Sequence, residues 1–268
     1  MTTRTPRNRK QQKVPDAQVL DDLVRRIVAA LSPQEVLLFG SASRGDMGPH
    51  SDIDLLVVLQ GPVDRMLARQ RAYDATRPVD TAHDIVVATS ADIERYGKSH
   101  ALVYKPALAE GRVLYRAPQG TLPASDLRAE EEPPLMAGRF EPDDPREWLN
   151  RARSNLRKAG MEAEGVYLED LLFDAQQAAE KAIKAVLILD NVAFPYVHTL
   201  ETLLDLCAAQ GRSLPVTLEE AKQLTPYAAA LRYPDLTTGV TADGYVDLVG
   251  IAEALVLWAE DQVGYGPP

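Results

Sequence analysis

The stretch GSASRGDMGPHSDIDLLVVL (residues 40–59) contains the pattern that decides the fold of the chain's first half. A Gly-Ser pair follows a short apolar run, ten residues intervene, and Asp52 and Asp54 then open a second apolar run. Apolar runs of this length, bounded by turn-forming residues, are typical of strands. We therefore expect two neighbouring strands joined by a glycine-containing loop, with polar side chains where the first strand ends and the second begins.

The two aspartates predict a metal site. Asp52 and Asp54 are two residues apart on an expected strand, so their side chains point to the same face. Paired carboxylates repel each other, and burying them is costly unless a cation compensates. Hard oxygen ligands suit Mg²⁺, which keeps waters and takes phosphate oxygens as further ligands. Asp84, which opens the run DIVVA, is the expected third carboxylate, as a metal ligand or as a base on an incoming hydroxyl, and Asp80 is the reserve.

The loop between the strands suits a phosphate group. Gly40 permits a tight turn and a close approach of backbone to phosphate. Ser41 offers a hydroxyl and a backbone N–H at the start of a short helix, and the Arg44 guanidinium can contact a phosphate through two nitrogens. The candidate phosphate-binding residues are Gly40, Ser41, Arg44 and Ser51.

The pattern of Gly-Ser, ten residues, Asp-x-Asp and a further Asp on a later strand resembles the minimal nucleotidyltransferase (MNT) domain of the polymerase-beta-like superfamily. The resemblance continues through ALAEGRVLY (residues 107–115), which looks like that family's final helix and strand, and it covers about residues 16–116. It implies an α/β (α+β) domain with a small mixed sheet, in which the Gly-Ser pair holds the triphosphate and the aspartates hold magnesium. The matching residues are Gly40, Ser41, Asp52, Asp54 and Asp84.

Hydrophobic periodicity predicts the remaining elements of the nucleotidyltransferase domain, residues 16–116. The expected helices cover residues 16–31, 64–76, 91–96 and 99–110, and the expected strands cover residues 36–39, 52–59, 84–88 and 113–115. Residues 117–145 then contain six prolines and an acidic run, which together exclude a long helix or a central strand. We expect a semi-rigid proline-rich linker there.

The second half, residues 146–264, contains no strand pattern. Helices are expected over residues 146–161, 168–189, 198–210, 218–231 and 245–263, which together predict an all-α bundle of four or five helices. Three segments resemble, in order, the HEPN family of helical bundles. They are DAQQAAEKAIKAVLIL (residues 174–189), HTLETLL (residues 198–204) and LTPYAAALRYP (residues 224–234).

Many HEPN proteins are ribonucleases that use an arginine followed, four to six residues later, by a histidine. This chain departs from that pattern, because no histidine follows Arg232. Without an imidazole there, the acid–base step of RNA cleavage has no agent, and we expect no nuclease activity. Arg232, Tyr233 and the nearby Tyr227 then either form a binding surface or end a helix. His198 is expected to cap or buttress the start of a helix.

Composition and charge narrow the functional classes. The 268 residues are 46% hydrophobic and 25% charged, with a net charge of −10, which argues against broad nonspecific adhesion to nucleic acid. Residues 1–15 are expected to form a disordered basic arm, which leaves contact with RNA or an acidic partner open. No apolar run reaches the roughly 18 residues of a membrane span. The single cysteine, Cys207, lies in an apolar stretch, is expected in the core and fits a reducing cytoplasm.

These observations predict a Mg²⁺-dependent nucleotidyltransferase that transfers AMP from ATP, or another nucleoside monophosphate, to a hydroxyl. In paired MNT and HEPN systems, the resemblance implies AMPylation of a tyrosine on a HEPN toxin, so the first hypothesis is a toxin–antitoxin-like module with a protein tyrosine as acceptor. The second is an aminoglycoside nucleotidyltransferase, because PHSDIDLLV is similar to those enzymes and an acidic cleft suits a cationic antibiotic. The third is a non-catalytic RNA- or protein-binding regulator. HEPN bundles commonly dimerise, so a homodimer through the helical domain fits.

Overall fold

The computed structural model describes residues 14–48, 51–129, 139–161, 164–195, 198–230 and 239–266. The basic residues of the arm at 1–13 lie outside them. The chain divides into two compact units, one within residues 1–99 and 103–134 and the other within residues 100–102 and 135–268.

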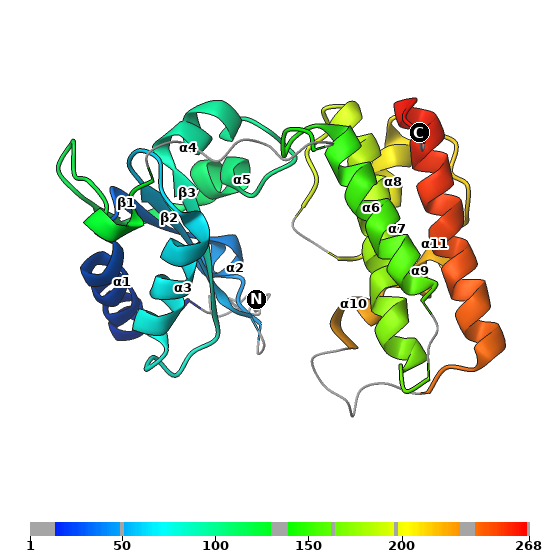
Figure 1. The fold of residues 1–268 in the computed structure, drawn as a ribbon, viewed down its shortest axis with the longest axis horizontal. Coiled ribbons are helices and arrows are strands. Elements are labelled where there is room, and N and C mark those ends of the chain that lie inside the picture. Colours follow the sequence, from blue (N-terminus) through cyan, green and yellow to red (C-terminus); the bar gives the residue numbers. More distant parts are fainter. Residues whose placement is uncertain are drawn as a thin grey trace, which may run out of the picture. The chain divides into compact units, whose positions relative to one another are not determined.

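The first unit combines a small sheet with short helices (Figure 1). Its helices are α1 (Ala17–Leu31), α2 (Gly40–Arg44), α3 (Arg65–Thr76), α4 (Ser90–Tyr96) and α5 (Tyr104–Glu110), and a 3-10 helix follows at Ser125–Leu127. Its strands are β1 (Glu35–Phe39), β2 (Ile53–Leu59), β3 (His83–Thr89) and β4 (Arg112–Arg116). The expected strands are confirmed, and the helix expected over residues 99–110 begins only at Tyr104.

The described strands pair in the order β3-β2-β1-β4. β2 and β3 run parallel, whereas β1 is antiparallel to both β2 and β4, so the sheet is mixed as predicted. The crossover between the parallel strands passes through α3, as a parallel connection requires. The fold class predicted for this half is therefore confirmed.

Both faces of the sheet are covered, which explains the nearly continuous apolar run of β2. Ile53, Leu55 and Val57 pack with α1 and α3 on one face, and Leu56 and Val58 pack with α4 and α5 on the other. Figure 1 shows the two helix pairs on opposite sides of the strands. Asp54 shares the face of Leu56 and Val58, because side chains on a strand alternate with a period of two.

Residues 117–128 pack against this unit, although the sequence placed them at the start of the linker. Leu127 is fully buried in the core that α1 and α3 build with the sheet. Ala124 donates a backbone hydrogen bond of 3.1 Å to the carbonyl oxygen of Leu31, and Arg128 forms an isolated β-bridge with Val63. Prolines exclude regular elements here, but they do not prevent the segment from burying a leucine. The acidic run at residues 130–132 lies outside the described residues.

The second unit is helical throughout its described residues. Its helices are α6 (Pro145–Ala159), α7 (Leu168–Leu189), α8 (Leu200–Ala209), α9 (Leu218–Lys222), α10 (Tyr227–Ala230) and α11 (Ala242–Val263). α7 packs along α6 and α11 (Figure 1), and its small buried residues, such as Ala175, Ala178 and Ala182, permit that close approach. The helical bundle predicted for this half is confirmed.

One predicted helix of the bundle is wrong. The sequence favoured a single helix over residues 218–231, but α9 ends at Lys222 and α10 begins at Tyr227. Pro226 lies between them, and proline in a helix interior removes a hydrogen bond and clashes with the preceding turn. Among the described residues, none of the helices combines the length and apolarity that a membrane crossing demands.

Candidate nucleotidyl-transfer site

The strand register brings the predicted Gly-Ser turn and two of the three aspartates to one end of the sheet. Phe39, the last residue of β1, lies opposite Asp54 on β2. Asp54 lies opposite Asp84 on β3. Gly40 directly follows Phe39, so the turn and the two carboxylates occupy adjacent positions across three strands. Asp80, the reserve candidate, is exposed in the turn before β3 and takes no part in this register.

Gly40 is required at the end of β1 for two reasons. Its φ of +67° lies in the left-handed region, which glycine adopts without strain. A Cβ added to Gly40 would stand 2.2 Å from Oδ2 of Asp54, far inside van der Waals contact. The backbone of the turn therefore lies directly against the carboxylate, and no side chain fits between them.

The charge of Asp54 is not balanced within the described residues. Burial raises the pKa of this carboxyl, the negative charges of Asp84 and Asp52 raise it further, and Arg44 opposes them, with a result of about 6. Like charges that share a site disfavour ionisation, and a bound cation reverses that effect. The surroundings of Asp54 therefore favour the binding of a cation.

The three carboxylates do not yet form one ligand set. Among the described residues, no group of three acidic, histidine or cysteine side chains is close enough to hold a metal ion. Asp52 lies just before β2, half-buried, and its charge acts on Asp54. Mutual repulsion keeps uncompensated carboxylates apart, so ligation by all three requires their side chains to move together.

Asp84 is held from the side of α3. Its Oδ1 accepts a hydrogen bond from the Tyr73 hydroxyl and another from the backbone N–H of Ile85. Nη2 of Arg69 lies 3.4 Å from the same oxygen. Neither Tyr73 nor Arg69 was expected at the site from the sequence. Their spacing of four residues on an expected helix places both on one face, but nothing in the sequence shows that this face meets Asp84.

The predicted phosphate-binding residues have local partners. Nη1 of Arg44 lies 3.0 Å from Oε2 of Glu110, and its Nε lies 3.4 Å from Oδ2 of Asp46. Ser51 accepts a hydrogen bond of 2.8 Å at Oγ from the backbone N–H of Gly48, which closes the loop before β2. Ser41 is half-buried at the start of α2. Arg44 is about half exposed, so its guanidinium can exchange these carboxylates for phosphate.

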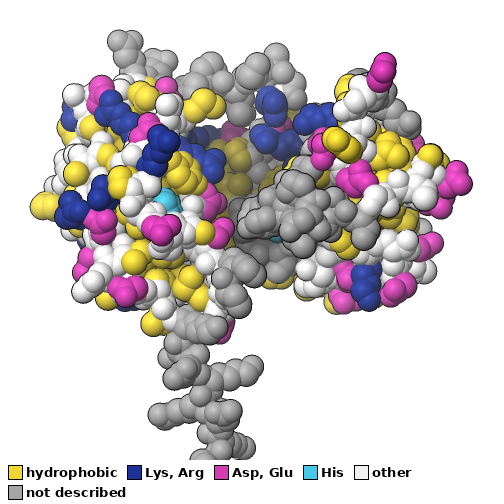
Figure 2. Space-filling model, turned by 90° about the horizontal axis from the view of Figure 1, so that it is seen from below, with side chains coloured by type: hydrophobic (Ala, Val, Ile, Leu, Met, Phe, Trp, Pro, Cys, Tyr) yellow, Lys and Arg dark blue, Asp and Glu magenta, His cyan; other side chains and the backbone are white. Residues whose placement is uncertain are grey.

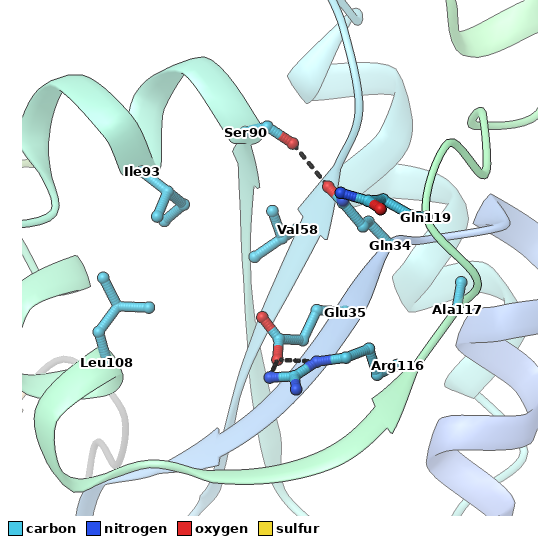
Figure 3. A pocket seen from close by; sticks show the side chains of 9 residues that line it. All are labelled: Gln34, Glu35, Val58, Ser90, Ile93, Leu108, Arg116, Ala117 and Gln119. Carbon is cyan, nitrogen blue, oxygen red and sulfur yellow. Dashed lines mark hydrogen bonds and ion pairs between the residues drawn. The ribbon is translucent and has the colours of Figure 1, made fainter.

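A separate cavity of about 430 Å³ lies at the other end of the same sheet face (Figure 3). Ile93 and Leu108 point into it from α4 and α5. Glu35 accepts a hydrogen bond of 3.0 Å from Nε of Arg116 at its floor. Glu35 and Phe39 are four residues apart on β1, so the cavity lies roughly 13 Å along the strand from the carboxylates. The cavity and the carboxylate site are therefore distinct.

The helical unit contains its own buried carboxylate. Glu180 on α7 accepts hydrogen bonds from Lys184 at 2.6 Å and from Gln176 at 3.0 Å, and Nδ1 of His198 lies 3.0 Å from its Oε2. Burial raises the pKa of Glu180, but the hydrogen bond with His198 and the charge of Lys184 outweigh it and lower the pKa to about 2. His198 buttresses the segment before α8, as the sequence suggested.

Other predictions for the helical unit have mixed outcomes. Cys207 is fully buried in the bundle core, and burial raises the pKa of its thiol to about 12, so its assignment as a core residue is confirmed. Tyr227 begins α10 and is half-buried. Arg232 and Tyr233 lie outside the described residues.

Surface charge gives no sign of a basic stripe on the face drawn in Figure 2. Basic and acidic side chains are interspersed there over the described residues of the first unit.

Family models identify both of the expected domains, in the expected order. Residues 21–108 match the family model of the nucleotidyltransferase domain, and residues 145–262 match the model of the HEPN domain. Among solved structures, the chain is similar to the crystal structure of spectinomycin adenyltransferase AAD(9) from Enterococcus faecialis with ATP and spectinomycin. That similarity has 12% sequence identity and a TM-score of 0.43, and it covers 90% of this chain and 99% of the other. No curated protein matches significantly.

Proposed function

We propose that this chain, which joins a nucleotidyltransferase domain to a HEPN domain, transfers a nucleoside monophosphate from a triphosphate to a hydroxyl group and releases pyrophosphate. ATP is the proposed donor and Mg²⁺ the proposed cofactor. The proposed acceptor is a protein tyrosine, in a toxin–antitoxin-like module, because the combination of domains resembles modules with that activity. The proposed residues of the site are Gly40, Ser41, Arg44, Ser51, Asp52, Asp54 and Asp84.

One observation carries the proposal. Asp54 lies against the backbone of Gly40 and near two further carboxylates, and its pKa is raised by burial and by their charges. A purely structural aspartate at the start of a strand gains nothing from such neighbours. Uncompensated charge beside an open backbone turn is instead what a cation and a polyphosphate would relieve together.

The residues fit a divalent cation in chemistry as well as in charge. Asp52 and Asp54 would hold Mg²⁺ through hard carboxylate oxygens, with Asp84 as a third ligand. Bound there, the ion would supply Lewis-acid polarisation of the phosphate that is attacked. Gly40 contributes a turn that phosphate can approach closely, and Arg44 contributes a guanidinium that can leave Glu110 for phosphate. Asp84 would accept the proton of the acceptor hydroxyl if it is not a ligand.

The test is incubation of the full chain with labelled ATP and Mg²⁺, followed by mass analysis of the protein and of added acceptors. Asp52→Asn and Asp54→Asn keep the side-chain shape and remove the charge, so both should strongly lower the rate of transfer. Asp46→Asn is the matched control, because Asp46 is an exposed aspartate of the same loop that pairs only weakly with Arg44. Transfer that survives in both site variants would contradict the proposal.

The acceptors offered in this assay decide between the remaining functions. Adenylylation of a tyrosine, on this chain or on an added protein, supports the toxin–antitoxin-like hypothesis. Modification of an aminoglycoside in place of a protein would identify an antibiotic nucleotidyltransferase. Binding of RNA without Mg²⁺ or nucleotide, combined with no transfer to any acceptor, would identify a non-catalytic regulator.

A further inference from the structure

Tyr73 lies on α3, outside the predicted site, yet its side chain contacts the expected third carboxylate. Its hydroxyl donates a hydrogen bond to Oδ1 of Asp84 and accepts one of 3.0 Å from the backbone N–H of Ile85. We propose that Tyr73 is a positioning residue, which fixes the Asp84 carboxylate for the divalent cation of the transfer reaction. This inference rests on the proposed function.

The hydroxyl bridge exists because β3 is an edge strand of the described sheet. Backbone N–H groups on the outer side of an edge strand need partners from outside the sheet. The N–H of Ile85 has two such partners, the Tyr73 hydroxyl and Oδ1 of Asp84 at 2.9 Å. Backbone, hydroxyl and carboxylate thus form one closed set of hydrogen bonds, which limits rotation of the Asp84 side chain.

The tyrosine ring is itself held by two neighbouring side chains. It stacks on the His83 ring with centroids 5.9 Å apart and an angle of 23°, and the Arg69 guanidinium lies 5.7 Å from its centroid. The His83 ring is held in turn, with Nδ1 2.7 Å from the carbonyl oxygen of Thr81 and Nε2 2.9 Å from Oγ1 of Thr76. A hydroxyl on so constrained a ring points in one direction, which is what a positioning role requires.

The two carboxylate oxygens of Asp84 have different surroundings. Tyr73, the N–H of Ile85 and the guanidinium of Arg69 all approach Oδ1. Within the described part of the chain, Oδ2 has no hydrogen-bond or ion-pair partner. Hydrogen bonds to one side of a metal-binding carboxylate orient it and raise its affinity for the ion. Oδ2 is therefore the oxygen left to bind the cation while Oδ1 stays anchored.

The experiment compares Tyr73→Phe with wild type in the full chain. This substitution removes only the hydroxyl and keeps the stacked ring, so the fold should persist, as the thermal melting midpoint will show. Mn²⁺ is the probe, and its binding is measured by electron paramagnetic resonance with and without a non-hydrolysable ATP analogue. Arg71→Gln is the control on the same helix, because Arg71 pairs with Asp126 at 2.9 Å and not with Asp84.

We expect Tyr73→Phe to weaken Mn²⁺ binding about tenfold, the lower end of the effect of losing such a partner. Its kcat should fall at limiting Mg²⁺ and recover as Mg²⁺ is raised, with the KM for ATP at saturating Mg²⁺ unchanged. Unchanged or tighter Mn²⁺ binding by this variant would overturn the positioning role alone. Absence of Mn²⁺ binding and of transfer in wild type would overturn the proposed function itself, so the two failures are distinguishable.

Discussion

Asp54 and Glu180 are both carboxylates taken largely out of water, one in each unit, and their surroundings have opposite effects. Burial raises the pKa of Asp54, and the charges of Asp84 and Asp52 raise it further, to about 6. Burial also raises the pKa of Glu180, but His198 and Lys184 reverse the effect and lower it to about 2. The fold compensates one negative charge and leaves the other uncompensated.

The surroundings of Asp54 and Glu180 distinguish a functional carboxylate from a structural one. The helical unit surrounds Glu180 with donors on two turns of α7 and the segment before α8, so the ionised form is stable in the folded protein. The first unit places Asp54 beside like charges, which costs stability unless a ligand binds. A site whose charges destabilise the empty protein gains free energy when a ligand compensates them. A structural ion pair is already compensated and gains nothing from a ligand.

The largest effect expected from this comparison is on catalysis. Asp54→Asn should lower the rate of nucleotidyl transfer about a thousandfold, since a metal ligand contributes several kcal/mol to the transition state. The same variant should melt at a higher temperature than wild type in EDTA at pH 7.5, because a repelled charge has gone. The transfer assay measures the loss of rate, and calorimetry measures the change in melting temperature. A lower melting temperature would show that Asp54 is a structural residue like Glu180.

Next in size is the loss of a partner from the compensated site. Lys184→Met leaves Glu180 with less positive charge and should lower the free energy of unfolding of the helical unit by about 3 kcal/mol. Lys222→Met is the matched control, because Lys222 and Glu219 are exposed and 3.8 Å apart, so its cost should stay below about 0.5 kcal/mol. Urea unfolding followed by circular dichroism measures both. Equal costs would show that burial adds nothing to the pair.

The pH dependence of unfolding should have opposite signs at the two sites. The folded pKa of Glu180, about 2, lies below its usual 4.5, so its stabilisation is complete above about pH 4.5 and is lost as the pH falls toward 2. The full effect is about 3 kcal/mol, of which about 2 kcal/mol should be lost between pH 7 and pH 3. Urea unfolding measures this loss as the change with pH in the stability difference between wild type and Glu180→Gln. A difference that does not change with pH would contradict it.

Asp54 should act in the other direction. Its folded pKa is raised above 3.8, so metal-free protein should gain stability from this group as the pH falls through about 6. The gain should be absent in Asp54→Asn. Melting temperatures in EDTA between pH 8 and pH 5 should show wild type approaching Asp54→Asn as the pH falls, and a gap that stays constant or widens would refute the prediction.

The smallest expected effect separates backbone strain from contact with Asp54. Gly40 and Gly61 both have positive φ, +67° and +78°, and alanine at such a position costs about 1–2 kcal/mol. A Cβ at Gly61 meets nothing within 4 Å, whereas one at Gly40 meets the Asp54 carboxylate. Gly61→Ala should therefore cost only the strain and leave transfer intact, whereas Gly40→Ala should cost more and impair transfer. Identical effects on unfolding and on kcat would mean that the close approach is irrelevant.

Much of the first unit followed from sequence because its signals are local. Short apolar runs bounded by turn-forming residues identified the strands, and a period of 3.6 residues identified most helices. The neighbourhood of Asp54 and Asp84 followed from their places at the starts of two strands. Pro226 indicates a break in the helix expected over residues 218–231, but the alanine-rich run after it favoured a single continuous helix.

What sequence could not supply were contacts that depend on packing. Tyr73 meets Asp84 only because α3 lies against the outer side of β3, and no periodicity in residues 64–76 shows that. Of Lys184 and His198, which both lower the pKa of Glu180, only Lys184 could be predicted as a partner from the sequence. Lys184, four residues later, follows from helical spacing, but His198 reaches Glu180 across a loop. The anchoring of Leu127 was hidden for a similar reason, since prolines suggested a linker and one leucine among them gave no contrary signal.

β2 serves two cores and one site, and this has a consequence for how the protein can change over time. Leu55 and Leu56 face opposite sides of the sheet, both fully buried, and Asp54 precedes them. Inserting or deleting a single residue here would exchange the faces of every later side chain. Such an event would disrupt both cores at once, so gains and losses of chain length are tolerated in the flanking loops and not within β2. The site residue Asp54 and the core residues of β2 are therefore inherited together.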